Sequence, residues 1–296
     1  MCRYSPKIDL VFRKLFGSEE NKDLLLDFLN SVLEGNIVIE KITLKNPYNL
    51  SDYINGKLSV LDVKAEDENG IWYDIEMQLS EQSFYGRRAL YYWSKIYSEQ
   101  IQSAYKYDEL KKTIGIHLLD FDYFDDEKYF RRATIKDFDT NEIYENLDYM
   151  DLYFIEMSKF NKKHSELKTK LDQWITFLNE AYILDKENLP YELEGEKIGK
   201  AVEKLEIMYL DEKEKQIYEA KQKMMMDTTE IIRTAKEKGL EEGREEGREE
   251  GIEKGIEKGK KEAKIKTAKK MLLKNLDIED ISELTELSIE EIKKLK

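Results

Sequence analysis

The sequence predicts a mixed α/β core, with helices packed on a mixed sheet, followed by a helical C-terminal extension. In the first part of the chain, amphipathic segments of helical period alternate with strand-like segments in the order helix, strand, hairpin, helix, strand. Beyond about residue 200 the composition shifts to Glu, Lys and Gly, which is typical of long solvated helices. The 296 residues suffice for one good core and a second small unit.

The first helix is predicted at residues 18–35, in the segment SEENKDLLLDFLNSVLEG. Ser18 stands at the N-cap position, acidic residues follow in or near the first turn, and Gly35 ends the helix. Its apolar stripe comprises Leu25, Phe28, Leu29, Val32 and Leu33. The next segment, NIVIEKITL at residues 36–44, is predicted to form a strand, which Pro47 breaks.

A β-hairpin is predicted at residues 58–80, LSVLDVKAEDENGIWYDIEMQLS. Its apolar residues alternate with polar ones, as in two strands that each bury one face. The apolar face comprises Leu61, Val63, Ala65, Ile71, Tyr73, Ile75, Met77 and Leu79. The opposite face comprises Asp62, Lys64, Glu66, Asp74, Glu76 and Gln78. This second face therefore gathers carboxylates on two adjacent strands.

The turn decides which residues of the hairpin face each other. A two-residue Asn69-Gly70 turn would mix the apolar and polar faces, which burial disfavours. A three-residue loop at 68–70, with Gly70 in the left-handed conformation, keeps the two faces aligned. The opposed pairs are then Asp62 with Glu76, Lys64 with Asp74, Val60 with Gln78, and Asp67 with Ile71. We expect this register; the alternative is a longer loop that also keeps the two faces aligned.

The pairing of Asp62 with Glu76 has a chemical meaning. Like charges that oppose each other across two strands are destabilising, so this pair calls for a cation. Mg²⁺ takes oxygen ligands, often one or two carboxylates together with water and substrate phosphate. The alternative is a solvated polar face on which Lys64 and Asp74 make a weak ion pair. The residue pattern alone leaves both interpretations open.

A long helix is predicted at about residues 84–107, and buried-type strands at TIGIHLLDF (113–121) and LDYMDLYFIEMSKF (147–160). The apolar side of this helix comprises Leu90, Trp93, Ile96, Tyr97, Ile101 and Ala104. His117 lies within the first of these strands, so we expect a core residue rather than a general base. From about Lys163 onward the chain is predicted to be helical, with one proline interruption.

The net charge is −14, and most of the negative charge lies in residues 1–200. A nucleic-acid partner would therefore have to contact a local basic patch. On the helix at 84–107, one side carries Arg88, Tyr92, Lys95, Glu99, Gln102 and Lys106. The candidate contacts to a DNA backbone are Arg87, Arg88, Lys95 and Lys106. A plain solvated face is the alternative for each of them.

Neither a disulfide nor a thiolate zinc site is available, because Cys2 is the only cysteine in the sequence. The only histidines, His117 and His164, lie far apart along the chain. No stretch of about 18 uncharged apolar residues is present, and the N-terminal segment MCRYSPKIDL has no signal-type apolar region. We therefore expect a cytoplasmic protein with oxygen ligands and no membrane association, rather than a zinc hydrolase.

Glycines recur at every fourth position in the segment KGLEEGREEGREEGIEKGIEKGK, namely Gly239, Gly243, Gly247, Gly251, Gly255 and Gly259. Each costs a helix ~1 kcal/mol relative to Ala. Pairs of Glu with Lys or Arg three and four residues apart contribute only ~0.2–0.5 kcal/mol each. Residues 226–263 are thus predicted to form a marginal, poorly packed helix that acts as a solvated spacer. Alternatively, the Gly stripe would let two helices approach closely.

Residues 264–296 regain an amphipathic pattern and are predicted to form a small three-helix unit. Asp277 stands at an N-cap, and Ser288 with Glu291 matches a capping box. The apolar residues of this unit are Leu272, Leu276, Ile278, Ile281, Leu284, Leu287, Ile289 and Ile292. The unit resembles helix-turn-helix modules. It lacks a basic reading face before Lys293, so a packing or dimer-forming cap is the alternative.

Asp62, followed after the turn by Glu76-x-Gln78, resembles the D…(D/E)-x-K signature of the PD-(D/E)XK nuclease superfamily. Three stretches more narrowly resemble the Rpn family of recombination-promoting nucleases and transposases. These stretches are SPKIDLVFRKLFGSEENKDLLLDFLNSVL, LDVKAEDENGIWYDIEMQ and RRALYYWSKIYSEQI. The resemblance spans roughly residues 5–160, and a Glu-rich tail is also typical of that family. It implies a restriction-endonuclease-like αβββαβ core and Mg²⁺-dependent cleavage of DNA.

The sequence departs from the superfamily signature at Gln78, where the superfamily usually has Lys, although E-x-Q is usual in the Rpn-like branch. Gln keeps a donor and an acceptor but lacks the positive charge that would stabilise the transition state. Lys64, on the same face two residues after Asp62, is a candidate for supplying this charge. Its alternative role is to pair with Asp74 across the strands.

The resemblance implies a site in which Asp62 and Glu76 bind Mg²⁺, or Mn²⁺ in its place. Asp74 is then an outer ligand, and Gln78, with Lys64 as a helper, orients the attacking water and stabilises charge. The predicted function is a DNA endonuclease associated with recombination or mobile elements. The alternative is a catalytically weak nuclease-fold binding or accessory protein that self-associates through its helical tail.

The predicted organisation has four parts. They are a nuclease-like core at 1–160, a helical extension packed on it at 161–225, the spacer helix at 226–263 and the cap at 264–296. The cap carries the apolar surface beyond the core. We therefore expect DNA as a partner and a homo-oligomer that forms through the C-terminal helices.

Overall fold

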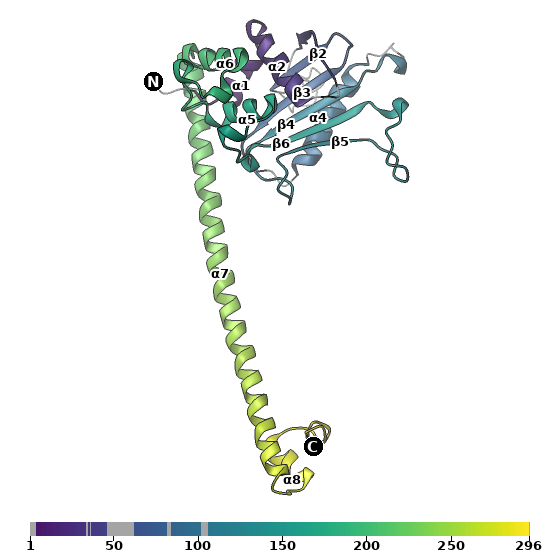
Figure 1. Cartoon of the computed structure of the whole chain (residues 1–296), viewed down its shortest axis with the longest axis vertical. Coiled ribbons are helices and arrows are strands. Elements are labelled where there is room, and N and C mark those ends of the chain that lie inside the picture. The colour runs from purple at the N-terminus through teal and green to yellow at the C-terminus, as the bar shows by residue number, and fades with distance from the viewer. Residues whose placement is uncertain are drawn as a thin grey trace. The chain divides into compact units, whose positions relative to one another are not determined.

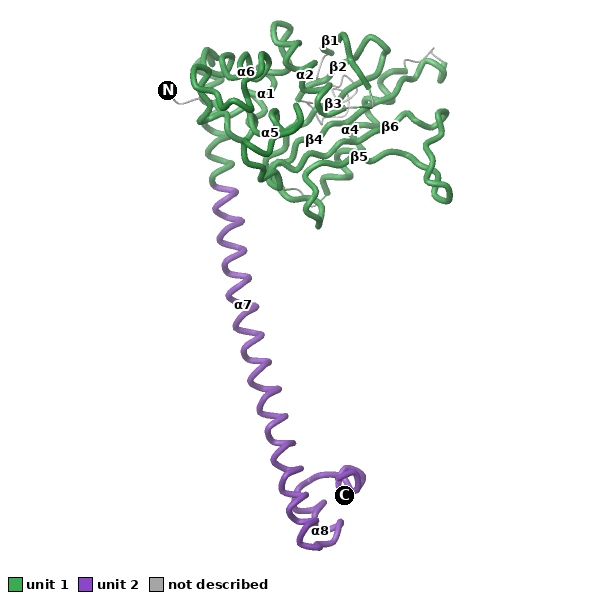
Figure 2. Tube along the Cα trace, in the orientation of Figure 1, with its two compact units in different colours: residues 1–226 green, residues 227–296 purple. Residues whose placement is uncertain are grey.

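The computed structural model describes residues 4–33, 35, 37–45, 62–81, 84–101 and 106–295. The chain divides into two compact units, residues 1–226 and residues 227–296, which are coloured separately in Figure 2. The predictions above that concern Cys2, Pro47, Val60, Leu61, Gln102 and Ala104 lie outside the described residues. In the part of the chain that is described, no helix combines the length and the apolar character needed to cross a membrane.

The first unit is built on a six-stranded mixed sheet with the strand order β1-β2-β3-β4-β6-β5 (Figure 1). Its strands are β1 Ile42–Leu44, β2 Val63–Asp67, β3 Trp72–Gln78, β4 Thr113–Leu119, β5 Phe130–Thr134 and β6 Met150–Glu156. The strands β1, β2 and β3 pair antiparallel, whereas β3, β4 and β6 pair parallel and β5 pairs antiparallel with β6. The predicted mixed sheet is therefore confirmed.

Helices cover both faces of this sheet. The helices of the first unit are α1 Asp9–Phe16, α2 Lys22–Val32, α4 Tyr85–Glu99, α5 Lys170–Glu180, α6 Glu196–Ile207 and the first turns of α7 Glu212–Leu272. Apolar residues of the strands, such as Tyr73, Ile75 and Ile116, form one core with α1, α2, α5 and α6. On the other face, α4 contributes Tyr85 and Ala89 to a smaller core. Among the described residues, the order from α2 to β4 is αβββαβ, as predicted.

Short 3₁₀ helices connect these elements. They are Glu19–Asn21, Tyr107–Glu109, Glu145–Leu147, Met157–Lys159, His164–Glu166, Lys186–Asn188 and Tyr191–Leu193. The first of them corrects the predicted start of the helix at residue 18. α2 begins at Lys22. Ser18 stands at the N-cap position of the 3₁₀ turn instead, and its side chain makes no capping hydrogen bond. The strand predicted at 36–44 is likewise shorter, since it covers only Ile42–Leu44.

The hairpin has the register that was predicted from its turn. Lys64 faces Asp74 in the antiparallel pair of β2 and β3. The Asp67 backbone N–H donates to the carbonyl oxygen of Ile71 over 3.0 Å, which closes a three-residue loop. Gly70 has φ +80°, a left-handed conformation that glycine adopts without steric cost. The turn therefore aligns the polar residues of both strands on one face.

The helix predicted at 84–107 is shorter than expected and rotated. α4 ends at Glu99, and Lys106 stands before a separate 3₁₀ turn rather than on the helix. Ile96 is buried, as predicted, but Leu90 of the same predicted side is 49% exposed, and Tyr85 and Ala89 are buried in its place. The buried side is set by the sheet residues beneath it. The edge strand β5, with its polar sequence FRRAT, was not predicted, because it lacks an apolar alternation.

The second unit contains the remainder of α7, together with α8 Ile278–Thr285 and α9 Ile289–Lys293. Its small core comprises Ala268, Ile281, Leu287 and Ile292. Ser288 and Glu291 form the predicted capping box, but the Asp277 side chain makes no capping hydrogen bond. Leu276, Leu284 and Ile289 were predicted in the core and are instead exposed. Residues 227–263 are helical and surrounded by solvent on nearly all sides.

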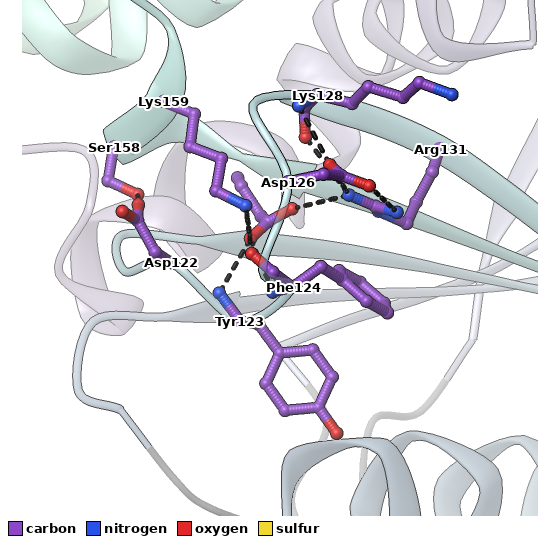
Figure 3. Close-up of polar contacts among 9 residues, drawn as sticks. Asp122, Tyr123, Phe124, Asp126, Lys128, Arg131, Ser158 and Lys159 are labelled. Carbon is purple, nitrogen blue, oxygen red and sulfur yellow. Dashed lines mark hydrogen bonds and ion pairs between the residues drawn. The ribbon is translucent and has the colours of Figure 1, made fainter. Parts of the chain in front are cut away.

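Glu156 lies at the end of β6 and is fully buried, yet every side of its carboxylate has a partner. It accepts hydrogen bonds from the backbone N–H groups of Tyr123 and Phe124 over 2.7 and 3.0 Å. The Lys159 ammonium lies 2.8 Å from it and the Arg131 guanidinium 3.4 Å. Figure 3 shows Lys159 and Arg131 reaching in from two sides, with Arg131 also bound to Asp126. This network fixes the loop that follows β4.

We expect Glu156→Gln to lower the free energy of unfolding by about 3 kcal/mol, because it leaves a buried ammonium without its counter-charge. The Lys159 side chain is only 7% exposed. Urea unfolding measures the change, and the exposed Glu142→Gln is the matched control. Equal unfolding midpoints for the two variants would show that the network contributes nothing to stability.

Candidate active site

A cleft of about 460 Å³ lies in the first unit, between α1, the hairpin, α4 and the first turns of α7. Both acidic and basic side chains line it. The carboxylates that line it are Asp9, Asp62 and Glu76, and the cations opposite them include Arg13, Arg88 and Lys221. The cleft therefore combines oxygen donors for a cation with cations for an anion, within a protein of net charge −14.

Each of the two motif carboxylates accepts a hydrogen bond from a backbone N–H of the opposite strand segment. The Asp62 N–H donates to Glu76 Oε1 over 3.3 Å, and the Met77 N–H donates to Asp62 Oδ2 over 2.9 Å. Asp62 is 8% exposed and Glu76 is 3% exposed. The structure thus brings the two motif carboxylates together, where the β2–β3 hairpin lines the cleft. Their remaining oxygens face the cleft cations.

Two arginines stand beside the motif carboxylates. Arg13 Nε of α1 lies 3.6 Å from Asp62 Oδ1, and Arg88 Nη2 of α4 lies 3.6 Å from Glu76 Oε2. Both distances exceed an ordinary charged hydrogen bond, so these are loose ion pairs. Of the residues predicted to contact a DNA backbone, Arg88 is the one that lines the cleft. An arginine beside each carboxylate places positive charge where a phosphate would have to approach.

Asp9 belongs to the cleft and was not predicted from the sequence. Its carboxylate accepts from Arg13 Nη2 over 2.7 Å and from the Lys221 ammonium. Burial alone would raise the pKa of Asp9, but Lys221 and then Arg13 more than offset this, and the pKa is lowered. The available signal was the amphipathic segment DLVFRKLF, which begins with Asp9 and places Arg13 four residues later on the same helical side.

Asp74 is fully buried two residues before Glu76, and neither of its carboxylate oxygens has a hydrogen-bond partner among the described residues. Burial, and then the charge of Asp62, raise the pKa of Asp74 to about 8. Burial, and then Asp74 and Asp62, also raise the pKa of Glu76 well above its usual range. Burial raises the pKa of Asp62 to about 6. Burial is thus the main reason that these three carboxyls resist ionisation, and the neighbouring cations offset it only in part.

The donor set fits Mg²⁺. Within the described ranges, no three side chains of His, Cys, Asp or Glu stand together as a complete protein shell for a metal. Mg²⁺ does not require such a shell, because it keeps several waters and is commonly bound through one or two carboxylates plus substrate phosphate. The orphaned oxygens of Asp74 are a second sign that positive charge is missing here. Asp62 and Glu76 are the residues that would hold the ion.

The raised pKa values predict that the metal-free protein loses stability as pH rises. A carboxyl with a raised folded-state pKa stabilises the fold below its unfolded pKa and loses this contribution as pH rises through the folded value. For Asp74 this window runs from about 4 to about 8. Each proton contributes at most about 1.4 kcal/mol per pH unit. Thermal unfolding in EDTA should therefore show a falling midpoint from pH 5 to pH 8.5.

Asp74→Asn should make that dependence shallower, because the substituted side chain carries no proton to release and only Asp62 and Glu76 still do. The exposed Asp139→Asn is the control and should leave the dependence unchanged. A midpoint that rises with pH in EDTA, or the same slope in Asp74→Asn as in the unmodified protein, would contradict the assignment.

Lys64 lies opposite Asp74, as predicted, but its ammonium takes neither of the two predicted roles. Its ammonium is 2.6 Å from Glu99 Oε2 of α4 and 4.8 Å from the centre of the Trp72 ring. It is 2% exposed and does not line the cleft. The expected ion pair with Asp74 is not formed, since both Asp74 oxygens lack a partner within the described part of the chain. α4 lies over this part of the polar face and supplies Glu99 as the counter-charge.

The other predicted residues divide between the cleft and its surroundings. Gln78 lines the cleft, and its amide Nε2 donates to the Ser80 carbonyl oxygen over 3.2 Å. Arg87 is exposed and lies 5.1 Å from the Phe84 ring, whereas Lys95 lies 5.4 Å from the ring of Tyr91. Neither residue, nor Lys106, is part of the cleft lining.

His117 is a core residue, as predicted. It is fully buried on β4, and its Nδ1 lies 3.1 Å from the Tyr85 hydroxyl. Burial, and then the charge of Arg88, lower the pKa of His117 to about 3, so the imidazole is neutral at physiological pH. His117 therefore does not change its protonation near neutral pH and is not suited to be a general base.

The mixed sheet of αβββαβ order and the two motif carboxylates on its hairpin define a restriction-endonuclease-like protein of the nuclease class. The family model described as "PD-(D/E)XK nuclease family transposase" matches residues 6–235. The chain belongs to this family, which confirms the resemblance to PD-(D/E)XK transposases. The function is accordingly nuclease-like or transposase-associated. No curated protein and no solved structure matches the chain.

Proposed function

We propose that this protein is a Mg²⁺-dependent DNA endonuclease that hydrolyses phosphodiester bonds during recombination or the movement of mobile elements. The observation that carries the proposal is the buried Asp62–Glu76 pair, hydrogen-bonded across the hairpin and faced by Arg13 and Arg88. Two carboxylates supply the ligands for the ion, and two guanidiniums supply the charge for a phosphate. Mn²⁺ is expected to substitute for Mg²⁺.

The residues divide the work as follows. Asp62 and Glu76 hold the ion, which when bound lowers the pKa of water and neutralises charge on the phosphate. Gln78 offers both a donor and an acceptor at the cleft and orients the attacking water. Asp74, from its buried position behind these residues, acts as an outer ligand of the ion. Arg88 binds a non-bridging phosphate oxygen, so that the reacting phosphodiester is held in place.

The acidic surface makes a further demand on the reaction. With a net charge of −14, the protein repels DNA at long range, so the cleft cations and the bound metal must supply the attraction. Affinity for DNA should therefore be weak in EDTA and should rise when a divalent cation is added. This coupling favours an enzyme that acts with its metal over a protein that only stores DNA.

The direct test is cleavage of supercoiled plasmid by the full-length protein in Mg²⁺, Mn²⁺ and EDTA. Conversion to open-circular or linear DNA in either metal, and no conversion in EDTA, supports the proposal. Equal cleavage in EDTA would assign the activity to a contaminant or to a metal-independent site. Absence of cleavage in both metals over a range of salt concentrations would overturn the proposed function.

The second candidate is a catalytically weak binding or accessory protein that self-associates through its tail. Gln78 in place of the usual lysine favours it, as do the exposed apolar residues Leu273, Leu284 and Ile289 of the second unit. Under this alternative the core at 1–160 and the extension at 161–225 form a platform. Calorimetry at low salt separates the two, since only the enzyme requires Mg²⁺ or Mn²⁺ to bind at the hairpin.

A further inference from the structure

The first turns of α7 are part of the first unit and form one wall of the cleft. Tyr218 is 7% exposed, and its hydroxyl accepts a hydrogen bond from the Ser5 backbone N–H over 3.0 Å. Glu214 makes an ion pair with Lys14 of α1 at 2.8 Å. These two contacts fix α7 against the N-terminal segment. They also fix the direction of any side chain on the same helical side.

Lys221 is such a side chain, because it follows Tyr218 by three residues. It lines the cleft together with Asp62, Glu76 and Gln78, and its ammonium binds the Asp9 carboxylate. Lys221 is 40% exposed. The Lys221 ammonium can therefore leave Asp9 and bind an anion that enters from solvent, without a change in the backbone.

Each of the other nearby cations has an acidic partner of its own. Lys64 is buried and bound to Glu99 outside the cleft lining. Lys7 makes an ion pair with Asp120 at 2.6 Å. Arg13 and Arg88 each face one of the two motif carboxylates at 3.6 Å, and Arg13 also binds Asp9 over 2.7 Å. Lys221 instead faces Asp9, which lies outside the motif, so its charge adds to the cleft without competing for a motif carboxylate.

We propose that Lys221 is a catalytic residue that supplies the positive charge missing at Gln78, by binding a phosphate oxygen of the scissile phosphodiester as negative charge develops on it. The substrate class is DNA, and the inference rests on the proposed endonuclease function. A lysine from a helix distant in sequence thus takes the place of a lysine on the strand. Asp9 holds this ammonium toward the cleft until the phosphate arrives.

The test compares Lys221→Gln with Lys223→Gln in the full-length protein. Lys223 is exposed on another side of the same helix, and its substitution removes the same charge. The measurements are kcat and KM for a labelled DNA duplex, Mg²⁺ affinity by calorimetry, and the thermal midpoint. Lys221→Gln should lower kcat by about 100-fold, the loss found when one transition-state donor is removed, with a smaller change in KM. Lys223→Gln should match the unmodified protein.

Two further variants separate the proposed role from a structural one. Lys221→Arg keeps the charge and should recover part of kcat. The Mg²⁺ affinity should stay unchanged in Lys221→Gln, Lys223→Gln and Lys221→Arg. Asp9→Asn/Lys221→Gln removes the carboxylate that Lys221 binds. If Lys221 acts only by neutralising Asp9, this double variant regains activity, which would overturn the proposal. A double variant as slow as Lys221→Gln supports it.

The outcomes distinguish this inference from the proposed function. If the unmodified protein cleaves DNA and Lys221→Gln has a kcat within about twofold of it, Lys221 has no catalytic role and the endonuclease proposal stands. If the unmodified protein does not cleave in Mg²⁺ or Mn²⁺, both fail together. Should Lys221→Gln unfold, Lys221→Met keeps the aliphatic stem of the side chain and carries the same comparison.

Discussion

Glu76→Gln and Asp62→Asn are each expected to lower the rate of DNA cleavage by more than about 100-fold. Changing only the partners of metal ligands typically costs about 10–100-fold in activity or metal affinity, and these two residues are the proposed ligands themselves. Each substitution keeps the shape of the side chain and removes its charge. The rate loss should therefore come with lost Mg²⁺ binding in calorimetry, rather than with a change in the hairpin.

The same variants should be at least as stable as the unmodified protein when metal is absent. Burial and the neighbouring carboxyls raise the pKa of Glu76, so its ionisation destabilises the metal-free fold, and a neutral side chain removes that penalty. Glu66→Gln is the matched control, because Glu66 lies on the same polar face, pairs with Lys45 and is not part of the cleft lining. Plasmid nicking by Asp62→Ala and Glu76→Ala at the unmodified rate would move the activity to another site.

Truncation after Met226 is expected to leave a folded core that still binds metal, but to lower the oligomeric state and the share of double-strand breaks. The boundary follows the structure: Tyr218 and Lys221 belong to the first unit, and Met224 and Met225 line the cleft. A cut after Lys223 would instead remove two residues of the cleft wall. The apolar surface of the second unit is removed with the tail, and with it the proposed means of self-association.

Light scattering of the full-length and truncated proteins measures this effect as mass per chain. Leu284→Glu and Ile289→Glu in the full-length protein are the point variants to compare, because both residues are exposed in the second unit. They should reproduce the lower mass without shortening the chain. If all forms have the same mass per chain, the tail has no role in association and remains a spacer.

The hairpin could be predicted in detail because its constraints are local. Alternation fixes which residues share a face, and Gly70 fixes the loop length, so the sequence alone predicts that Asp62 lies beside Glu76. The same reasoning failed for Lys64. Its partner, Glu99, lies 35 residues away, and only the packing of α4 on the sheet brings the two together.

The rest of the cleft depends on packing between distant segments, which one sequence does not reveal. Asp9 could be recognised as the start of an amphipathic helix, but not as a neighbour of Asp62. Lys221 is 212 residues from its partner Asp9, so no spacing rule connects them. Leu90 shows a third limit: helical period gives the width of an apolar stripe, whereas the sheet beneath decides which side of α4 is buried.

Asp74 has a consequence for how this chain would change under selection. A fully buried carboxyl without a hydrogen-bond partner among the described residues lowers stability, and such sites are retained where function requires them. A gene copy relieved of the need to cut DNA would gain stability from almost any neutral residue at position 74. Substitution there should therefore be among the first steps by which a related copy loses cleavage and becomes a binding protein. The residue at this one position would then distinguish working copies from decayed ones.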